Sequence, residues 1–556
     1  MRTKSQDVST TCRYRSAIVC LAFMVGFTII FVRLFFLQVI QAEQGADQAR
    51  KQHYTSVMLE ANRGVIVDRH GKPLALNVDL PSVYAMPQTV QNPARVAKKL
   101  SRLLDVPSST VRKRLKKSQP FVWIKRKVDP KTAEAVRAQS FSGVDIVMEP
   151  RRYYPKGVLL SHLLGFAGID SQGLEGVELQ YETYLRGQKS MVRFQRDALG
   201  RTISLTGSKG RRPPQGYRIV LTIDEVIQYI AEQELESALN TTGAQKGAIL
   251  VMDPKTGAVL AWALRPSFDP NQLPIGSPEL WRNRALTDPY EPGSTLKIVV
   301  AAAALEEGVV NPDSLVYGGD GQMPVGGTIV HDPAKSGWMT FAEVLSQSSN
   351  VGIIKTAMSI GEARLFEYLR SFGFGEKTEI DLPGESTGIL REPSEWSSRS
   401  LASMAIGQEI GVTPIQLLTA LSAIANGGWL LKPFVVSEVT DHEGNSVMER
   451  TPEVKRRPIS HETAQILINL LTDVVDGGTG KRAFLRGYQV AGKTGTAQKF
   501  DKTIGRYSSS KVVGSFAGFV PALDPRLAML VVIDEPQTNK WGGVVAAPVF
   551  RKVAER

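Results

Sequence analysis

Residues 291–308 read EPGSTLKIVVAAAALEEG, a Pro-Gly turn followed by an alanine-rich apolar run. Alanine is the strongest helix former, and no glycine or proline interrupts the run before its end, so a helix beginning close to Ser294 is predicted. A serine at a helix start faces backbone N–H groups and the positive end of the helix dipole. Lys297 follows three residues later, one turn along the same face. The stretch therefore predicts a serine nucleophile with a lysine beside it.

Two further polar motifs follow along the chain, SSN at residues 348–350 and KTGT at residues 493–496. SSN lies between two apolar runs with helical spacing, where its side chains can point into a cleft. KTGT follows the apolar YQVAG and continues as TAQ, which predicts a strand edge able to line a groove. Ser-x-x-Lys, Ser-x-Asn and Lys-Thr-Gly in this order form a known signature of penicillin-binding proteins and serine β-lactamases.

Each motif alone carries little information, because average residue usage yields about two Ser-x-x-Lys matches in a chain of this length. A second match begins at Ser508 in the polar run YSSSK, which we interpret as a solvated, loop-like segment. A second Lys-Thr-Gly begins at Lys255 in DPKTGAVL, a composition typical of a turn between two strands. Only the set that begins at Ser294 has the three motifs in the required order.

Two lysines and a second serine complete the predicted chemistry. A serine hydroxyl is a poor nucleophile unless a base takes its proton, and burial and nearby cations lower the pKa of a lysine enough for that task. We expect Lys297 to be this base and Lys493 to be the second cation. Ser348 is expected to carry the proton toward the leaving amine. The reaction class is acyl transfer through a covalent serine intermediate.

The remaining site residues are expected to hold the substrate. The backbone N–H groups of Ser294 and Thr496 would stabilise the oxyanion, a contribution of about 3 kcal/mol for each donor. The side chain of Asn350 would hold a substrate amide. Thr494, Gly495 and Thr496 would line the substrate site, and the two threonine side chains would bind the terminal carboxylate.

The composition narrows the remaining classes of protein. The formal net charge is +13, but the basic residues are scattered along 556 residues, so a basic surface is favoured and nucleic acid is not expected as a partner. The only cysteines are Cys12 and Cys20, which cannot form a disulfide framework or a cysteine metal site. Six scattered histidines lack the spacing of zinc ligands. No metal and no cofactor is expected.

One apolar segment indicates the compartment. Residues 17–32 carry no charge, Arg33 interrupts, and apolar character continues to Ile40, about the length that crosses a bilayer. A cleaved signal peptide is the alternative, but the run is long and no small-x-small cleavage site follows it. Basic residues dominate before the segment, so the N-terminus is expected in the cytoplasm and the rest of the chain outside.

The exported part divides into two patterns. Residues 54–206 contain strand-like runs, a hairpin tip at residues 68–71 and a basic helical stretch from Pro93 to Lys117, with no catalytic constellation. Residues 207–216, GSKGRRPPQG, read as a linker. A helical run, VIQYIAEQELESALN, then precedes the strand-like GAILVMD, AVLAWAL, SFAGFV and LAMLVVID. An α+β fold with an antiparallel sheet flanked by helices is predicted.

Longer stretches carry a family resemblance. RGVIVDRHGKPLA from Arg63, RRYYPKG from Arg151, HLLGFAGIDSQGLEGVELQYE from His162, EPGSTLK, SSN, AIGQEIGVTPIQ and KTGTAQK together resemble the class B penicillin-binding proteins. Within them, GIDSQGLEG favours the division-type, penicillin-binding protein 3 group. The resemblance implies a cytoplasmic tail (1–16), a transmembrane anchor (17–40), a noncatalytic, dimerisation-type pedestal (41–215) and a penicillin-binding transpeptidase domain with a five-stranded sheet (216–556).

The resemblance also implies an activity and partners. Ser294 would attack the D-Ala-D-Ala bond of a peptidoglycan stem peptide at the septum, release D-alanine and pass the acyl group to a neighbouring stem, while β-lactams acylate the same serine. An FtsW-type lipid II polymerase and other divisome membrane proteins would be partners. The alternatives are a D,D-carboxypeptidase or β-lactamase-type hydrolase, an elongation-type transpeptidase, and a β-lactam sensor or scaffold.

Overall fold

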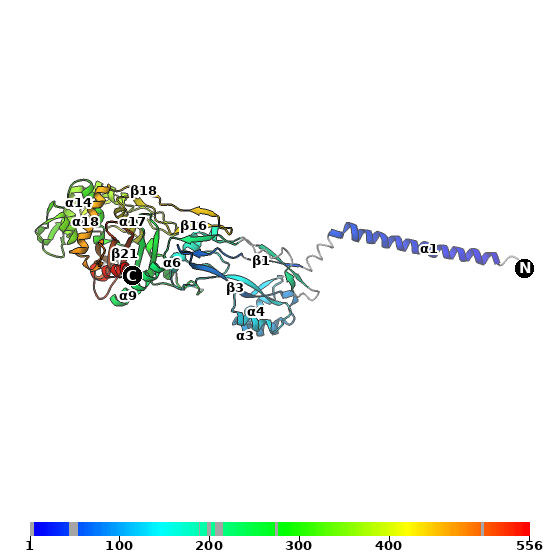
Figure 1. The fold of residues 1–556 in the computed structure, drawn as a ribbon. Helices are drawn as coiled ribbons and strands as arrows, with labels where there is room; N and C mark the ends of the chain where they lie inside the picture. The colour runs from blue at the N-terminus through cyan, green and yellow to red at the C-terminus, as the bar shows by residue number, and fades with distance from the viewer. Residues whose placement is uncertain are drawn as a thin grey trace. The chain divides into compact units, whose positions relative to one another are not determined.

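The chain forms two compact units in a computed structural model that describes residues 5–43, 54–59, 61–119, 121–187, 190–196, 202–205, 215–272, 276–501 and 505–556. One unit comprises Met1–Leu59, Leu80–Glu149 and Lys189–Arg212, and the other comprises Glu60–Asp79, Pro150–Gln188 and Pro213–Arg556 (Figure 1). The predicted linker at residues 207–216 lies outside the described residues, except for its last two.

The first unit begins with the long apolar helix α1, Ser5–Phe35, which continues as a π-helical turn, Phe36–Ile40. Within the described residues, Thr11–Ile40 is the one helical segment long and apolar enough to cross a bilayer, and its side chains pack against nothing in the protein. At 1.5 Å per residue it spans about 45 Å, more than a hydrocarbon core of about 30 Å. A membrane anchor follows from this length and composition.

The same unit holds a small α/β cluster. Helices α3 (Pro93–Leu104), α4 (Ser108–Leu115) and α5 (Pro130–Arg137) bury their apolar sides with strand β4 (Val122–Lys125) and the later part of β3 (Pro73–Ala85). The predicted basic helical stretch is confirmed, but it is two helices. Asp105 ends α3 in a left-handed conformation, and Pro107 precedes α4.

The second unit contains the predicted hairpin and a buried ion-pair cluster. Strands β2 (Ile66–Val67) and β3 pair antiparallel, and the Asp68 carboxylate closes the tip by accepting the backbone N–H groups of His70 and Lys72 at 2.9 and 2.8 Å. Nearby, the buried Glu178 carboxylate lies between the Arg63 and Arg152 guanidinium groups. Buried charges are stable only when they are paired in this way.

The centre of the second unit is a five-stranded antiparallel sheet in the order β10-β9-β21-β20-β19. Its strands are β9 (Lys246–Met252), β10 (Val259–Arg265), β19 (Ala491–Asp501), β20 (Arg506–Val520) and β21 (Leu527–Asp534). This confirms the predicted fold class and four of the predicted strands. β19 carries the KTGT motif and lies at an edge of the sheet, as the sequence predicts.

The two faces of the sheet bury two separate clusters. Ala248, Leu250 and Met252 of β9 face one cluster, and Ile249 and Val251 face the other, the period of two expected of a strand covered on both faces. Helices α9 (Glu225–Thr242) and α20 (Ala547–Glu555) cover the second face.

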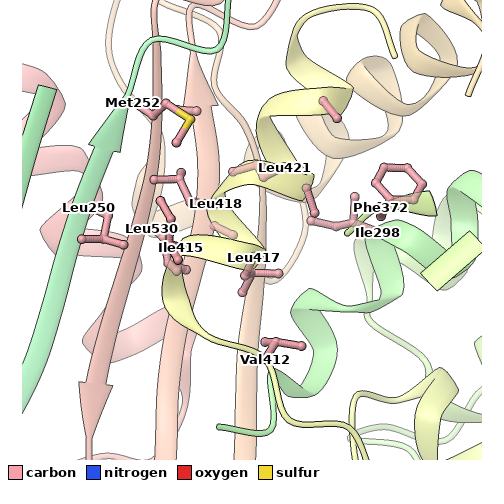
Figure 2. Close-up of a cluster of buried hydrophobic side chains, with 14 of the residues drawn as sticks. Leu250, Met252, Ile298, Phe372, Val412, Ile415, Leu417, Leu418, Leu421 and Leu530 are labelled. Carbon is pink, nitrogen blue, oxygen red and sulfur yellow. The ribbon is translucent and has the colours of Figure 1, made fainter. Parts of the chain in front are cut away.

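Helix α17 (Pro414–Ala425) covers the first face, and every one of its residues is buried. In Figure 2, Leu418 and Ile415 face Leu250 and Leu530 of the sheet, while Leu421 points toward Ile298 of helix α12 (Lys297–Glu306). α17 is therefore the layer that holds α12, the helix after Ser294, against the sheet.

The remaining helices and strands complete the second unit. They are α6 (Ser161–Leu164), α7 (Gly176–Gln180), α8 (Glu182–Leu185), β8 (Arg218–Leu221), α10 (Pro278–Trp281), α11 (Arg284–Thr287), β11 (Leu315–Tyr317), β12 (Gln322–Val325), β13 (Thr328–His331), β14 (Trp338–Thr340), α13 (Phe341–Ser346), α14 (Asn350–Ile360), α15 (Glu362–Ser371), α16 (Ser400–Ala405), β15 (Leu430–Leu431), β16 (Val436–Thr440), β17 (Ser446–Glu449), β18 (Val454–Arg456), α18 (His461–Asp476) and α19 (Gly542–Val545). In the first unit, β1 (Tyr54–Leu59), β6 (Ser190–Arg196) and β7 (Thr202–Leu205) form a three-stranded sheet, and β5 (Val144–Tyr153) crosses the boundary of the units.

Candidate active site

Ser294 lies in a single 3-10 turn, Gly293–Thr295, that leads directly into α12. Gly293 has a φ of +57°, and its N–H donates to the Gly407 carbonyl at 3.0 Å. A Cβ at Gly293 would lie 2.8 Å from the carbonyl oxygen of Thr496, so only glycine lets this turn pack directly against β19. The predicted position of Ser294 at a helix start is confirmed, and the turn holds it beside the KTGT strand.

Lys297 is completely buried in the first turn of α12. Its Nζ donates to the Ser348 carbonyl at 2.7 Å, to Ser348 Oγ at 3.3 Å and to Asn350 Oδ1 at 2.7 Å. The two oxygens of Ser348 come from the loop between α13 and α14, and Asn350 is the first residue of α14, so all three belong to the SSN motif. The first two motifs are therefore in direct contact.

Lys493 approaches the same hydroxyl from β19. It is also completely buried, and its Nζ donates to Ser348 Oγ at 2.9 Å and to the Thr494 carbonyl at 3.3 Å. Ser348 Oγ thus lies between two lysine amines that are far apart in the sequence. Ser348 has a φ of +61°, a left-handed conformation that a non-glycine residue keeps only when its surroundings enforce it, most often at functional sites.

The pKa values of both lysines are lowered from their ordinary value. Burial lowers the pKa of Lys297 well below its ordinary value, and the charge of Lys493 lowers it further, while Asp332 acts in the opposite direction. Burial lowers the pKa of Lys493 to about 7. A buried amine avoids the cost of holding an unsolvated charge by releasing its proton. A neutral Lys297 is thus available as a proton acceptor, as a nucleophilic serine requires.

Asp332 binds the SSN motif from the segment after β13, and no motif in the sequence indicated it. Its carboxylate accepts Ser349 Oγ at 2.6 Å and the Val351 N–H at 3.0 Å, and it also accepts the N–H of Asn350. Asn350 Nδ2 in turn donates to the His331 carbonyl at 2.8 Å. The carboxylate caps the start of α14 from another segment, so no spacing within the motif could have indicated it.

The predicted substrate-binding residues lie along β19. Thr494 Oγ1 donates to Thr479 Oγ1 at 3.0 Å, and Thr496 Oγ1 accepts the Gly542 N–H at 3.0 Å. A Cβ at Gly495 would lie 2.9 Å from the Pro292 carbonyl, so this glycine permits the close approach of the nucleophile turn. Thr479 and Gly542 belong to the site by contact, and no motif in the sequence indicated them.

Comparison with known proteins identifies this arrangement. Models of two domains match the chain, the penicillin binding protein transpeptidase domain at residues 247–555 and the penicillin-binding protein dimerisation domain at residues 58–221. The chain belongs to the penicillin-binding protein transpeptidase family. The two domains together make it a class B penicillin-binding protein, a serine-type peptidoglycan D,D-transpeptidase.

Relatives of this penicillin-binding protein match nearly its whole length. Stage V sporulation protein D of Bacillus subtilis is 38% identical over 98% of this chain and 85% of its own. Peptidoglycan D,D-transpeptidase FtsI of Escherichia coli is 32% identical over 97% and 90%. A crystal structure of penicillin binding protein 3 from Mycobacterium tuberculosis, complexed with aztreonam, has a TM-score of 0.70 at 30% identity and covers 90% of this chain and 96% of its own.

The two spurious motif copies lie elsewhere in this penicillin-binding protein. Lys255 occupies the predicted turn between β9 and β10 and pairs with Asp524. The interpretation of Ser508 as part of a solvated loop is wrong. Ser508 is buried in β20, and its Oγ accepts the backbone N–H groups of Ser510 and Lys511 at 3.2 and 3.0 Å. In the register of β19 and β20, Phe500 pairs with Tyr507 and Gln498 with Val512, so residues 508–511 form a bulge between these two pairs.

Replacement of Asp332 by Asn is expected to slow acylation by penicillin about tenfold, because a neutral amide caps the SSN loop less strongly. The pH at which acylation is half-maximal should move downward, since the charge that raises the pKa of Lys297 is lost. Stopped-flow acylation rates between pH 5 and 9 measure both effects. An unchanged pH profile would restrict Asp332 to a purely structural role.

Proposed function

We propose that this class B penicillin-binding protein crosslinks peptidoglycan stem peptides at the division septum through an acyl-enzyme on Ser294. The observation that carries the chemistry is the position of Ser348 Oγ, between Lys297 Nζ at 3.3 Å and Lys493 Nζ at 2.9 Å. The similarity to FtsI supports the septal role. It also supports our assignment of the chain to the penicillin-binding protein 3 type. β-Lactams would acylate the same serine.

In the acylation step, the neutral Lys297 accepts the proton of Ser294 while Oγ bonds to the carbonyl carbon of the penultimate D-alanine. The amide C–N bond then breaks, and the departing D-alanine amine takes a proton through Ser348. The hydrogen bonds of Ser348 Oγ to both lysines provide the path for this proton. The products are an ester on Ser294 and free D-alanine.

Substrate binding follows from the edge of β19. The backbone N–H groups of Ser294 and Thr496 are proposed to bind the oxyanion, and the hydroxyls of Thr494 and Thr496 the terminal carboxylate. Asn350 donates one N–H of its amide to His331 and retains a second for a substrate carbonyl. In the second half of the reaction, an amine of a neighbouring stem attacks the ester and restores the Ser294 hydroxyl.

The membrane arrangement belongs to the same proposal. Residues 1–16 form a cytoplasmic tail, 17–40 the anchor, 41–215 the pedestal and 216–556 the catalytic domain, outside the cytoplasmic membrane. The basic residues before the apolar segment support this orientation. An FtsW-type lipid II polymerase and other divisome membrane proteins are the proposed partners, through the anchor and pedestal.

Two assays test the function. Incubation of the full-length chain with a stem pentapeptide and an acceptor amine should give a crosslinked product and free D-alanine. Rapid hydrolysis of peptide and β-lactam, with no transfer, would assign a carboxypeptidase or β-lactamase instead. Depletion in growing cells should block division and produce filaments. Normal division with a defect confined to spores would favour the role named for the Bacillus relative.

A further inference from the structure

Helices α3 and α4 of the first unit carry an unusually one-sided charge. Residues 91–119 contain nine lysines and arginines and a single acidic residue, Asp105. Solvated helix faces normally mix both signs of charge, which limits repulsion between neighbours. In α3 and α4 the lysines and arginines repel one another without acidic neighbours to offset the repulsion. Neither helix contributes to the acyl-transfer site.

The basic residues of both helices share one surface. In α3 the buried positions include Val96 and Leu100, and in α4 they are Val111 and Leu115, all in one apolar cluster. At 100° per residue the exposed basic side chains fall on the opposite sides of the two helices. α3 and α4 pack side by side (Figure 1), so these sides form a single basic face. It consists of Arg95, Lys98, Lys99, Arg102, Arg112, Lys113, Lys116 and Lys117.

The charge of the basic face is not neutralised within the protein. In the described part of the chain, none of its eight side chains forms an ion pair with a carboxylate, and Lys99 contacts Gln139 and the ring of Phe141 instead. The neighbouring helix α5 adds Lys131 and Arg137, which its N-cap residue Asp129 and Glu134 balance. The face therefore presents an extended positive potential to an external anionic surface.

The apolar helix α1 indicates that the anionic surface near the basic face is a lipid bilayer. Residues 41–53 separate the end of the membrane-spanning segment from β1, and both belong to the same unit as the basic face. This stretch extends over at most about 45 Å, so the face is tethered close to a bilayer at a high effective concentration. Clusters of lysine and arginine held near a membrane attract anionic phospholipids.

We propose that the basic face of α3 and α4 binds the anionic phospholipid headgroups of the membrane in which the chain is anchored. The contact holds the pedestal against the bilayer surface and limits the positions that the catalytic domain can sample. It depends on the membrane anchor and not on the chemistry of Ser294. Penicillin labelling therefore reports separately on the proposed catalytic function.

Lysine acetylation in proteoliposomes tests the contact. The full-length chain is reconstituted in vesicles of phosphatidylcholine alone, or with one third phosphatidylglycerol, and treated with an acetylating ester before mass spectrometry. Acetylation of Lys98, Lys99, Lys113, Lys116 and Lys117 is expected to slow by about threefold or more in the anionic vesicles. The protection should vanish at about 0.5 M salt, where charges are screened within a few ångströms. The exposed Lys335 and Lys481 of the second unit should react equally in both vesicles.

A pair of matched variants separates the basic face from overall charge. Replacement of Arg112, Lys113, Lys116 and Lys117 by Gln should remove the protection of Lys98 and Lys99 on α3. Replacement of the exposed Lys335, Lys377, Arg482 and Arg486 by Gln removes the same charge and should leave that protection unchanged. Both variants should label normally with penicillin, which shows that the catalytic unit folds, and circular dichroism should show that the helices of the first unit are retained.

Three outcomes of these two experiments would overturn the proposal. They are equal acetylation in neutral and anionic vesicles, equal slowing at Lys335 and Lys481, and the same loss of protection in both variants. Protection that arises only after addition of another membrane protein would also overturn it, because the face would then bind an acidic protein surface.

Discussion

Ser294→Ala is expected to abolish covalent labelling by a fluorescent penicillin, with the acylation rate reduced by about 10³-fold or more. The substitution removes the side-chain hydroxyl of Ser294 from the turn before α12, whose first residue is the buried Lys297. It should cost little stability, because the Ser294 hydroxyl has no hydrogen-bond partner among the described residues. In-gel fluorescence after a fixed labelling time measures the effect.

Ser508→Ala is the matched control, because Ser508 begins the other Ser-x-x-Lys copy. Its hydroxyl accepts two backbone N–H groups within β20, so its loss should lower the free energy of unfolding by about 1 kcal/mol and leave labelling intact. Mass spectrometry of the labelled tryptic peptide should place the penicilloyl group on Ser294. Labelling that survives Ser294→Ala would refute the assignment of the nucleophile.

Lys297→Met is expected to slow acylation by about 10²- to 10⁴-fold while the protein stays folded, because methionine fills nearly the same volume without a basic nitrogen. In the wild type, acylation should accelerate as the pH rises through the lowered pKa of Lys297, since only the neutral amine accepts a proton. This rising limb should be absent in the variant. Lys255→Met, in the turn between β9 and β10, should acylate as the wild type does.

Lys297→Met also has a predictable effect on the dependence of stability on pH. The folded-state pKa of Lys297 lies below its ordinary value of 10.5, so the unfolded chain binds more protons between the two values, and stability rises with pH in that window. Lys493 contributes in the same direction from about pH 7 to 10.5. Lys297→Met should therefore weaken the rise of Tm with pH, and its Tm should gain most on the wild type at low pH. A Tm that depends on pH equally in both proteins would contradict the shifted pKa.

The sequence predicted those parts of the site that depend on local order. The turn before α12, the edge strand with Lys493 and the SSN loop follow from turn residues and apolar periodicity, and the order of the motifs predicted that they meet. The left-handed Ser348 and the carboxylate of Asp332 were not predictable. Both depend on contacts between segments distant in the sequence, for which a single chain carries no periodic signal.

The error at Ser508 has the same origin. A polar run such as YSSSK has no alternation of apolar and polar residues, and it lies at a bulge where the pairing of β20 with β19 is interrupted. The helices and strands with strong periodicity, such as α9 and β21, were predicted within a few residues. Composition therefore described the regular segments well, and it failed at the bulge between two long strands.

The glycines around the nucleophile turn restrict how this enzyme can become resistant to antibiotics. A Cβ at Gly542 would lie 2.0 Å from the Gly495 carbonyl, and one at Gly407 would lie 2.1 Å from the Gly293 carbonyl. A side chain at Gly542 would displace the KTGT strand, and one at Gly407 would displace the turn that holds Ser294, the proposed nucleophile. Under selection by β-lactams, tolerated substitutions should instead gather at exposed positions on the same elements, such as Phe500 of β19 and Trp541 before Gly542, which are 54% and 58% exposed. Resistance to β-lactams and crosslinking thus depend on the same closely packed backbone. Substitutions at exposed positions are those that can affect one without the other.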